Sequence, residues 1–148
     1  MKLEILVSAV NEDVDTLAER MNLQADAIIV NQCGENTYRE YTYQEHRIRC
    51  YSFAERGVGL SRNNCLMRAQ GDICLFADED IIYRPGAVRA IEAEFEKNPD
   101  ADMILFNMDV PEDRATYHID GYGRVRWYNC GRYPTYSFSA RTEKLREA

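Results

Sequence analysis

Short apolar runs alternate with amphipathic segments along most of the chain. The apolar runs predict strands at Leu3–Ala9, Asp26–Val30, Ile48–Phe53, Ile73–Ala77 and Met103–Met108. Each run is short and is bounded by polar residues or glycine, a pattern typical of strands that lie inside a sheet. The segments between the runs carry apolar residues at intervals of three and four, which is the spacing of one helical face.

Three helices are predicted between these strands. The first follows the polar run Asn11–Asp13, which can cap it, and the second covers Ser61–Gln70. The third has Pro85 in its first turn and ends at Asn98. The apolar faces of the first and third helices consist of Val14, Leu17, Ala18, Met21, Val88, Ile91, Ala93 and Phe95. Strands that alternate with amphipathic helices predict an α/β fold with an open, mostly parallel sheet flanked by helices.

Two stretches depart from this alternation. Glu35–Glu45 is a polar segment rich in tyrosine, and its tyrosines suit either stacking on a sugar or partial burial. After Pro111 the pattern changes to a hairpin over Tyr117–Tyr128 and a short strand over Thr135–Ala140. We see no internal repeat, linker or low-complexity tract.

Polar residues follow the predicted strands at the point where each strand ends. Asn11 follows the first strand, Gln32 the second and Asp78 the fourth. Parallel strands end at the same edge of a sheet, and ligands of open α/β sheets bind outside these carboxyl ends. The sequence therefore predicts a binding site along one rim.

The motif Asp78-Glu79-Asp80 is the strongest sign of chemistry at this rim. Two carboxylates one residue apart point to opposite faces of a regular strand, but at a strand end both can converge on one point. Such a point suits a hard divalent cation, Mg²⁺ or Mn²⁺, held against a diphosphate. The alternative is an acidic turn without a ligand.

Composition and charge narrow the class of protein. The 148-residue chain is expected to form one domain, and its formal net charge of −7 argues against general nucleic-acid binding. No apolar run approaches the roughly 20 residues that cross a bilayer, and the N-terminus lacks the apolar core of a signal peptide. The five cysteines contain no Cys-x-x-Cys pair, and Cys50 and Cys74 lie in apolar runs. We expect a cytoplasmic protein, with a peripheral place at a membrane left open.

The run from Arg56 to Asp80 resembles the central segment of family-two glycosyltransferases. That family reads Gly-hydrophobic-Ser/Ala-x-Ala/Arg-Arg-Asn, a short helix, Gly-Asp/Glu, a strand and Asp-x-Asp. The first strand with Val10-Asn11 is similar to the family's opening strand and Tyr-Asn pair. The resemblance extends from about Lys2 to Asp109, and it is the ordered combination of these pieces that is specific.

The resemblance implies a GT-A fold, a nucleotide-sugar donor, most often a UDP-sugar, and a divalent metal, Mg²⁺ or Mn²⁺. Asp80 matches the metal ligand, and Asp78 matches a carboxylate that contacts the ribose or helps to order the metal site. Arg62 matches an arginine near the base or the phosphates. The remaining residues that the resemblance places at the donor are Ser8, Ala9, Asn11 and Gln32. The acceptor, whether sugar, lipid or protein, stays unknown.

The chain departs from the family at the base-reading position. Family members commonly carry an aspartate that reads uracil, where this chain has Gln32. The amide offers both a donor and an acceptor, so it suits uracil or another base.

No family motif marks the catalytic base either. The base usually lies well beyond Asp-x-Asp, and the available carboxylates are Asp109, Glu112, Asp113 and Asp120. We therefore expect a single domain over residues 1–148 that is truncated or minimal on its acceptor side. The alternative is a non-catalytic nucleotide-sugar-binding or scaffold domain. A nucleotidyltransferase is disfavoured because Ser8–Glu12 contains no Gly-rich basic loop.

Overall fold

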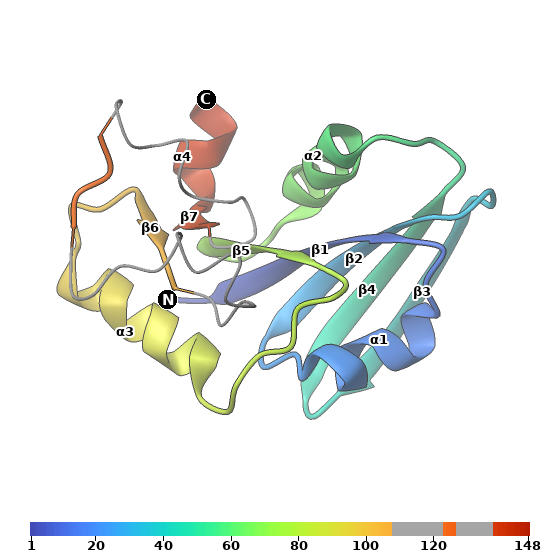
Figure 1. The fold of residues 1–148 in the computed structure, drawn as a ribbon, viewed down its shortest axis with the longest axis horizontal. Helices are drawn as coiled ribbons and strands as arrows, with labels where there is room; N and C mark the ends of the chain where they lie inside the picture. Colours follow the sequence, from blue (N-terminus) through green and yellow to red (C-terminus); the bar gives the residue numbers. More distant parts are fainter. Residues whose placement is uncertain (108–122, 127–137) are drawn as a thin grey trace, which may run out of the picture.

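The protein is built on a single seven-stranded sheet of order β3-β4-β2-β1-β5-β7-β6. The computed structural model describes residues 1–107, 123–126 and 138–148 (Figure 1). The strands are β1 (Leu3–Val10), β2 (Asp26–Gln32), β3 (Thr37–Tyr43), β4 (His46–Phe53), β5 (Ile73–Asp78), β6 (Met103–Leu105) and β7 (Phe138–Arg141). The helices are α1 (Val14–Met21), α2 (Val58–Arg68), α3 (Ala87–Lys97) and α4 (Thr142–Glu147).

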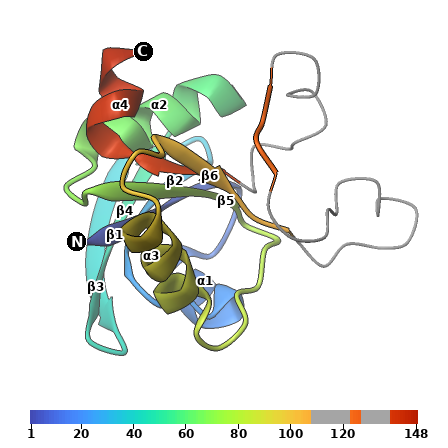
Figure 2. The same cartoon turned by 90° about the vertical axis from the view of Figure 1, so that its left-hand side faces the viewer.

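Helices cover both faces of the sheet. Figures 1 and 2 show α1 and α3 on one face and α2 and α4 on the other. Alternate residues of β1 belong to the two layers, because successive strand side chains point to opposite faces. Ile5 and Val7 pack with the apolar residues of α1 and α3, whereas Leu6 packs with Cys65 of α2.

The parallel part of the sheet confirms the predicted α/β class. Strands β4, β2, β1 and β5 run parallel, and β3 and β7 are antiparallel to their neighbours. Strand β1 lies between β2 and β5 and is paired along most of both edges. The helix predicted on Val14–Met21 is α1, capped by Asp13, whose side chain accepts from the N–H of Asp15 at 3.1 Å. Cys50 and Cys74, which lie in apolar runs of the sequence, are buried free thiols.

The tyrosine-rich segment contains a strand that the sequence pattern did not reveal. Residues Thr37–Tyr43 form β3, the edge strand, which pairs antiparallel with β4. Its apolar and polar residues do not alternate cleanly because most of the strand is exposed. Tyr41 and Tyr43 pack against the core, and the Tyr41 hydroxyl donates to the carbonyl oxygen of Val14 at 2.7 Å. Tyr38 is half-exposed and its ring contacts Tyr51.

The remaining differences concern helix and strand ends. Helix α2 begins at Val58, nearly one turn before the predicted Ser61. Pro85 does not lie in the first turn of α3, because Gly86 is the N-cap and the helix starts at Ala87. Strand β6 ends at Leu105 rather than reaching Met108. Helix α4 follows β7 directly.

Several predictions fall on residues that the structure does not describe. Most of the hairpin over Tyr117–Tyr128 and the start of the strand over Thr135–Ala140 are among them, and the described residues 123–126 of that hairpin form no strand. The end of that last strand is seen as β7. In the described parts of the chain, no helix is long and apolar enough to cross a membrane.

A buried ion pair ties the N-terminal half of the sheet to the end of α2. Glu4 of β1 and Arg49 of β4 are both buried, and an Arg49 Nη2 donates to the Glu4 carboxylate at 3.0 Å. The same nitrogen donates to the carbonyl oxygen of Arg68, the last residue of α2, at 3.0 Å. The other Glu4 oxygen accepts from the N–H groups of Gln70 and Gly71. The two buried charges therefore balance each other, and both oxygens of the Glu4 carboxylate accept hydrogen bonds within the fold.

Candidate functional site

The predicted rim is formed where the parallel strands end. Ser8 of β1 lies opposite Asp78 of β5 and opposite Val30 of β2, and Val10 lies opposite Gln32. The chain leaves β1 towards β2 and leaves β5 towards the opposite edge of the sheet. The junction of β1 and β5 is therefore a topological switch point, the usual place for a ligand in an open α/β sheet.

Three of the predicted residues face the α2 side of the sheet at this junction. Paired residues of neighbouring strands share a face, so Ser8 and Asp78 point the same way, and Gln32 lies two residues beyond Val30 on that face. Arg62 of α2 reaches Asp78, with 3.5 Å between its Nη2 and the carboxylate Oδ1. The structure thus brings Ser8, Asp78 and Arg62 to one place.

The N-terminus of α2 opens onto the same rim. Its N-cap is Gly57, which has φ 138° and makes no side-chain capping bond. The residues of the first turn, including Val58 and Leu60, are exposed. Backbone N–H groups at an uncapped helix start favour an anion. The arrangement of this helix start beside Arg62 suits a negatively charged ligand.

Two consecutive amides at the end of β2 hold the loops on either side of the rim. Asn31 binds the backbone of Glu12 through both polar atoms, at 3.1 Å and 3.0 Å. Gln32 Nε2 donates to the carbonyl oxygen of Gly57 at 2.7 Å, and its Oε1 accepts from the Gly57 N–H at 3.3 Å. Asn31 therefore fixes the loop before α1, and Gln32 fixes the loop before α2.

Ala9 and Asn11 take different places at the end of β1. The Ala9 side chain is buried in the core on the α1 side, so only its backbone can face the rim. Asn11 is exposed with φ 51°, a left-handed conformation that asparagine tolerates better than most residues. Its N–H donates to the carbonyl oxygen of Gln32 at 2.9 Å, which extends the pairing of β1 and β2 by one residue.

The three carboxylates of the acidic motif follow β5 directly. Asp78 ends the strand and is partly exposed, Glu79 is partly exposed, and Asp80 is exposed in the turn. Burial raises the pKa of Glu79, and repulsion from Glu12, Asp80 and Asp78 adds to this rise. Burial, and to a smaller extent the neighbouring negative charges, therefore disfavour ionisation of Glu79.

This donor set suits a divalent cation that is completed by a ligand. Within residues 1–107, 123–126 and 138–148, no three His, Cys, Asp or Glu side chains are grouped so that they could hold a metal ion by themselves. Mg²⁺ is commonly held by only one or two carboxylates together with waters and substrate phosphates. Asp80 and Asp78 offer such a pair, and a cation there would relieve the repulsion around Glu79. The residues fit the metal that the sequence predicted.

Two buried hydroxyls near the site have no hydrogen-bond partner among the described residues. One is that of Ser61, the residue before Arg62, and the other is that of Tyr83 on the opposite layer. Burial raises the pKa of Tyr83, with a further contribution from the charge of Asp78. Sequence reasoning missed both, as it missed the role of Asn31, because each depends on contacts between distant segments.

The four carboxylates considered as a catalytic base are not part of the described structure. Asp109, Glu112, Asp113 and Asp120 all lie within residues 108–122. Their role stays a prediction.

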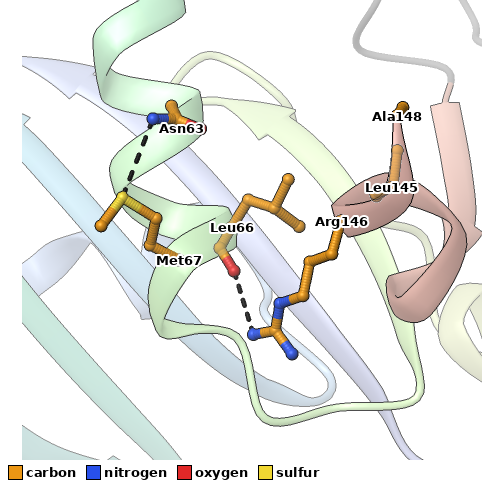
Figure 3. A pocket seen from close by; sticks show the side chains of 6 residues that line it. All are labelled: Asn63, Leu66, Met67, Leu145, Arg146 and Ala148. Atoms are coloured by element: carbon orange, nitrogen blue, oxygen red, sulfur yellow. Dashed lines mark hydrogen bonds between the residues drawn. The ribbon is translucent and has the colours of Figure 1, made fainter.

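A separate groove lies between α2 and α4 (Figure 3). It has a volume of about 390 Å³ and is lined by Asn63, Leu66, Met67, Leu145, Arg146 and Ala148. Arg146 donates to the carbonyl oxygen of Leu66 at 3.1 Å across one wall. None of the predicted site residues lines this groove, so it is not part of the rim.

Comparison with known proteins gives one family and one set of structures. Residues 5–144 match the family model described as Glycosyl transferase family 2. No curated protein sequence matches the chain. The crystal structure of S. aureus TarS 1-349 is similar, with a TM-score of 0.63 and 16% identity over 99% of this chain and 49% of that one.

Two further structures of TarS show the same likeness. TarS 1-349 in complex with UDP-GlcNAc has a TM-score of 0.64 and 15% identity, over 99% of this chain and 47% of that one. The longer TarS structure has a TM-score of 0.61 and 17% identity, over 99% of this chain and 29% of that one. The chain thus spans about half of the shorter TarS structures, and at this level of identity the likeness concerns the fold.

Proposed function

Because the chain belongs to glycosyl transferase family 2 and has the GT-A fold, we propose that it binds a nucleotide-diphosphate sugar at the rim and transfers the sugar to an acceptor. The observation that carries this proposal is the meeting of Arg62 with Asp78 at the switch point of the sheet, directly before Asp80. A cation site, an arginine and an open helix start at one point match the charges of a diphosphate.

Each residue at the rim has a part in this proposal. Asp80 and Asp78 hold Mg²⁺ or Mn²⁺, which when bound neutralises the charge of the leaving diphosphate. Arg62 and the first turn of α2 add positive potential on the other side of the diphosphate. Ser8, Asn11 and the backbone of Ala9 line the end of β1 and contact the nucleoside.

We propose a UDP-sugar as the donor, and UDP-GlcNAc is the first one to test. The support comes from the family and from the TarS structure that contains UDP-GlcNAc. The test is calorimetric titration of UDP-GlcNAc into the protein with Mn²⁺, alongside Arg62→Met. Binding by the unmutated protein that is weakened in the variant would support the proposal. Failure to bind any of the common nucleotide-sugars in the presence of Mn²⁺ would exclude it.

This chain is expected to bind the nucleotide-sugar donor but to transfer the sugar slowly or not at all. No family motif marks a catalytic base, and loss of a general base costs about 10² to 10⁴ in rate. Relative to a typical turnover of about 10 s⁻¹, we expect about 0.001 to 0.1 s⁻¹ or less. The measurement is nucleotide release from UDP-GlcNAc with Mn²⁺ and a mixed acceptor pool, in the buffer used for binding.

Rapid turnover would contradict this expectation and would also exclude the alternative, a non-catalytic binding or scaffold domain. Single alanine substitutions would then identify the base among the four candidate carboxylates, Asp109, Glu112, Asp113 and Asp120.

Nucleotide selectivity is expected to be looser than is usual for the family. Both polar atoms of Gln32 already bind Gly57, so this residue is poorly placed to discriminate strongly between bases. Titration of UDP, GDP, CDP and ADP with Mn²⁺ measures the selectivity directly. A preference for UDP above about a hundredfold, roughly 2.7 kcal/mol, would show that another group reads the base.

A further inference from the structure

We infer that Gln32 is a positioning residue: its side-chain amide sets the start of α2 and thereby places Arg62 opposite Asp78. This inference rests on the proposed function only where it concerns a bound nucleotide. The placement of the helix is a property of the free protein.

The contacts run from the end of β2 into the first turn of α2. The Gln32 side chain is buried, with 7% of its surface exposed, and its two polar atoms bind the carbonyl oxygen and the N–H of Gly57. The same Gly57 carbonyl accepts from the N–H of Ser61 at 2.9 Å. Gln32 therefore holds the residue on which the first turn of the helix is built, and Arg62 is the next residue after Ser61.

The residue types fit this role. Gly57 has φ 138°, a backbone conformation that residues with a side chain rarely adopt, and α2 has no capping side chain of its own. An amide can donate to a carbonyl and accept from an N–H at the same time, whereas a carboxylate can only accept. An acidic residue at this position would place its charge against the Gly57 carbonyl oxygen. A neutral amide is thus required by the backbone that it binds.

The position of Arg62 depends on this attachment. Its contact with Asp78 is 3.5 Å long and partly exposed, so the ion pair is too weak to draw the helix into place by itself. A displacement of a binding group by about 1 Å can cost about a hundredfold in the step that it serves. The start of α2 must therefore be fixed by another contact, and the Gln32 amide supplies it.

The first measurement needs no ligand. Gln32→Met keeps the length of the side chain and removes both hydrogen bonds. It is expected to lower the protection of the Ser61 amide against hydrogen exchange by about tenfold, the worth of one buried hydrogen bond. The Nε–Hε resonance of Arg62 is expected to shift, because its contact with Asp78 loosens. Asn31→Leu is the matched control, which should expose the Glu12 amide and leave Ser61 unchanged.

The second measurement separates positioning from base recognition. Titrations with Mn²⁺ use UDP and inorganic pyrophosphate, which has no base. Gln32→Met is expected to weaken both ligands by a similar factor, about tenfold. In an Arg62→Met background the same substitution is expected to have no further effect, because a positioning residue acts through the group that it places.

Specific results would overturn the inference. Unchanged Ser61 protection and an unchanged Arg62 resonance would show that Gln32 does not hold the helix. If Gln32→Met weakens the binding of UDP but not of pyrophosphate, Gln32 is assigned to the base instead. The same assignment follows if Gln32→Met weakens UDP binding in the Arg62→Met background as much as it does in the unmutated protein. If Gln32→Met fails to fold, Gln32→Glu keeps the acceptor for the Gly57 N–H but repels the Gly57 carbonyl oxygen, and it is also expected to lower Ser61 protection. If the unmutated protein binds neither ligand, the proposed function fails, and the exchange data still decide the inference.

Discussion

Asp80→Ala is expected to abolish the gain in nucleotide affinity that Mn²⁺ gives to the unmutated protein. In the proposed site, Asp80 and Asp78 hold the cation and the diphosphate completes its coordination. We expect Mn²⁺ to strengthen UDP binding by at least about tenfold, which is about 1.4 kcal/mol. The substitution removes one of the two carboxylates that offer this site. Calorimetric titration of UDP with Mn²⁺ and with a chelator measures the gain in both proteins.

A control substitution of another acidic residue distinguishes the loss of a metal ligand from the loss of negative charge alone. Glu96 is exposed on α3, and Glu96→Ala removes the same formal charge outside the rim. This control is expected to keep the full gain from Mn²⁺. Equal UDP affinity with and without Mn²⁺ in the unmutated protein would rule out the metal proposal, whatever the variants show.

Arg49→Met is expected to lower the free energy of unfolding by about 3–5 kcal/mol. The substitution leaves the buried Glu4 carboxylate without its cation, although the N–H groups of Gln70 and Gly71 still bind it. It also removes the donor that binds the carbonyl oxygen of Arg68 at the end of α2. Urea unfolding followed by circular dichroism measures the change.

The same strand supplies a control for this prediction. Arg47 lies two residues earlier on the same face and pairs with Glu40 at the surface. Exposed pairs contribute little, so Arg47→Met is expected to cost far less than Arg49→Met. The double variant Glu4→Gln/Arg49→Met is expected to recover part of the loss, because it removes the unpaired charge. Equal losses for Arg47→Met and Arg49→Met would contradict the expectation.

The sequence predicted the central sheet because burial of its strands is nearly complete. Strands such as Ile73–Ala77 are buried on both faces, so they read as continuous apolar runs whatever their neighbours are. The edge strand Thr37–Tyr43 is mostly exposed, and its charged residues are satisfied by ion pairs such as Arg39 with Asp15. Its pairing with β4 is tertiary information that a local pattern does not carry.

The candidate site likewise contains residues that the sequence pattern reveals and residues that only the structure reveals. Asp78 and Arg62 were predicted because an ordered motif contains both and a strand end places one of them. The partners of Asn31 and Gln32 lie 19 and 25 residues away, and no periodicity connects them. The residues proposed to bind at the rim were therefore readable from the sequence, whereas the residues that hold its loops required the structure.

The adjacency of Asn31 and Gln32 has a consequence for how β2 can change in evolution. Successive strand residues face opposite layers, so these two neighbours serve the loop of α1 and the loop of α2 respectively. Insertion or deletion of one residue within β2 would rotate both amides to the wrong layer and detach both loops at once. A single substitution at either position would release one loop, whereas a change in the length of the strand would release both, so variation in length is expected to be confined to the loops on either side.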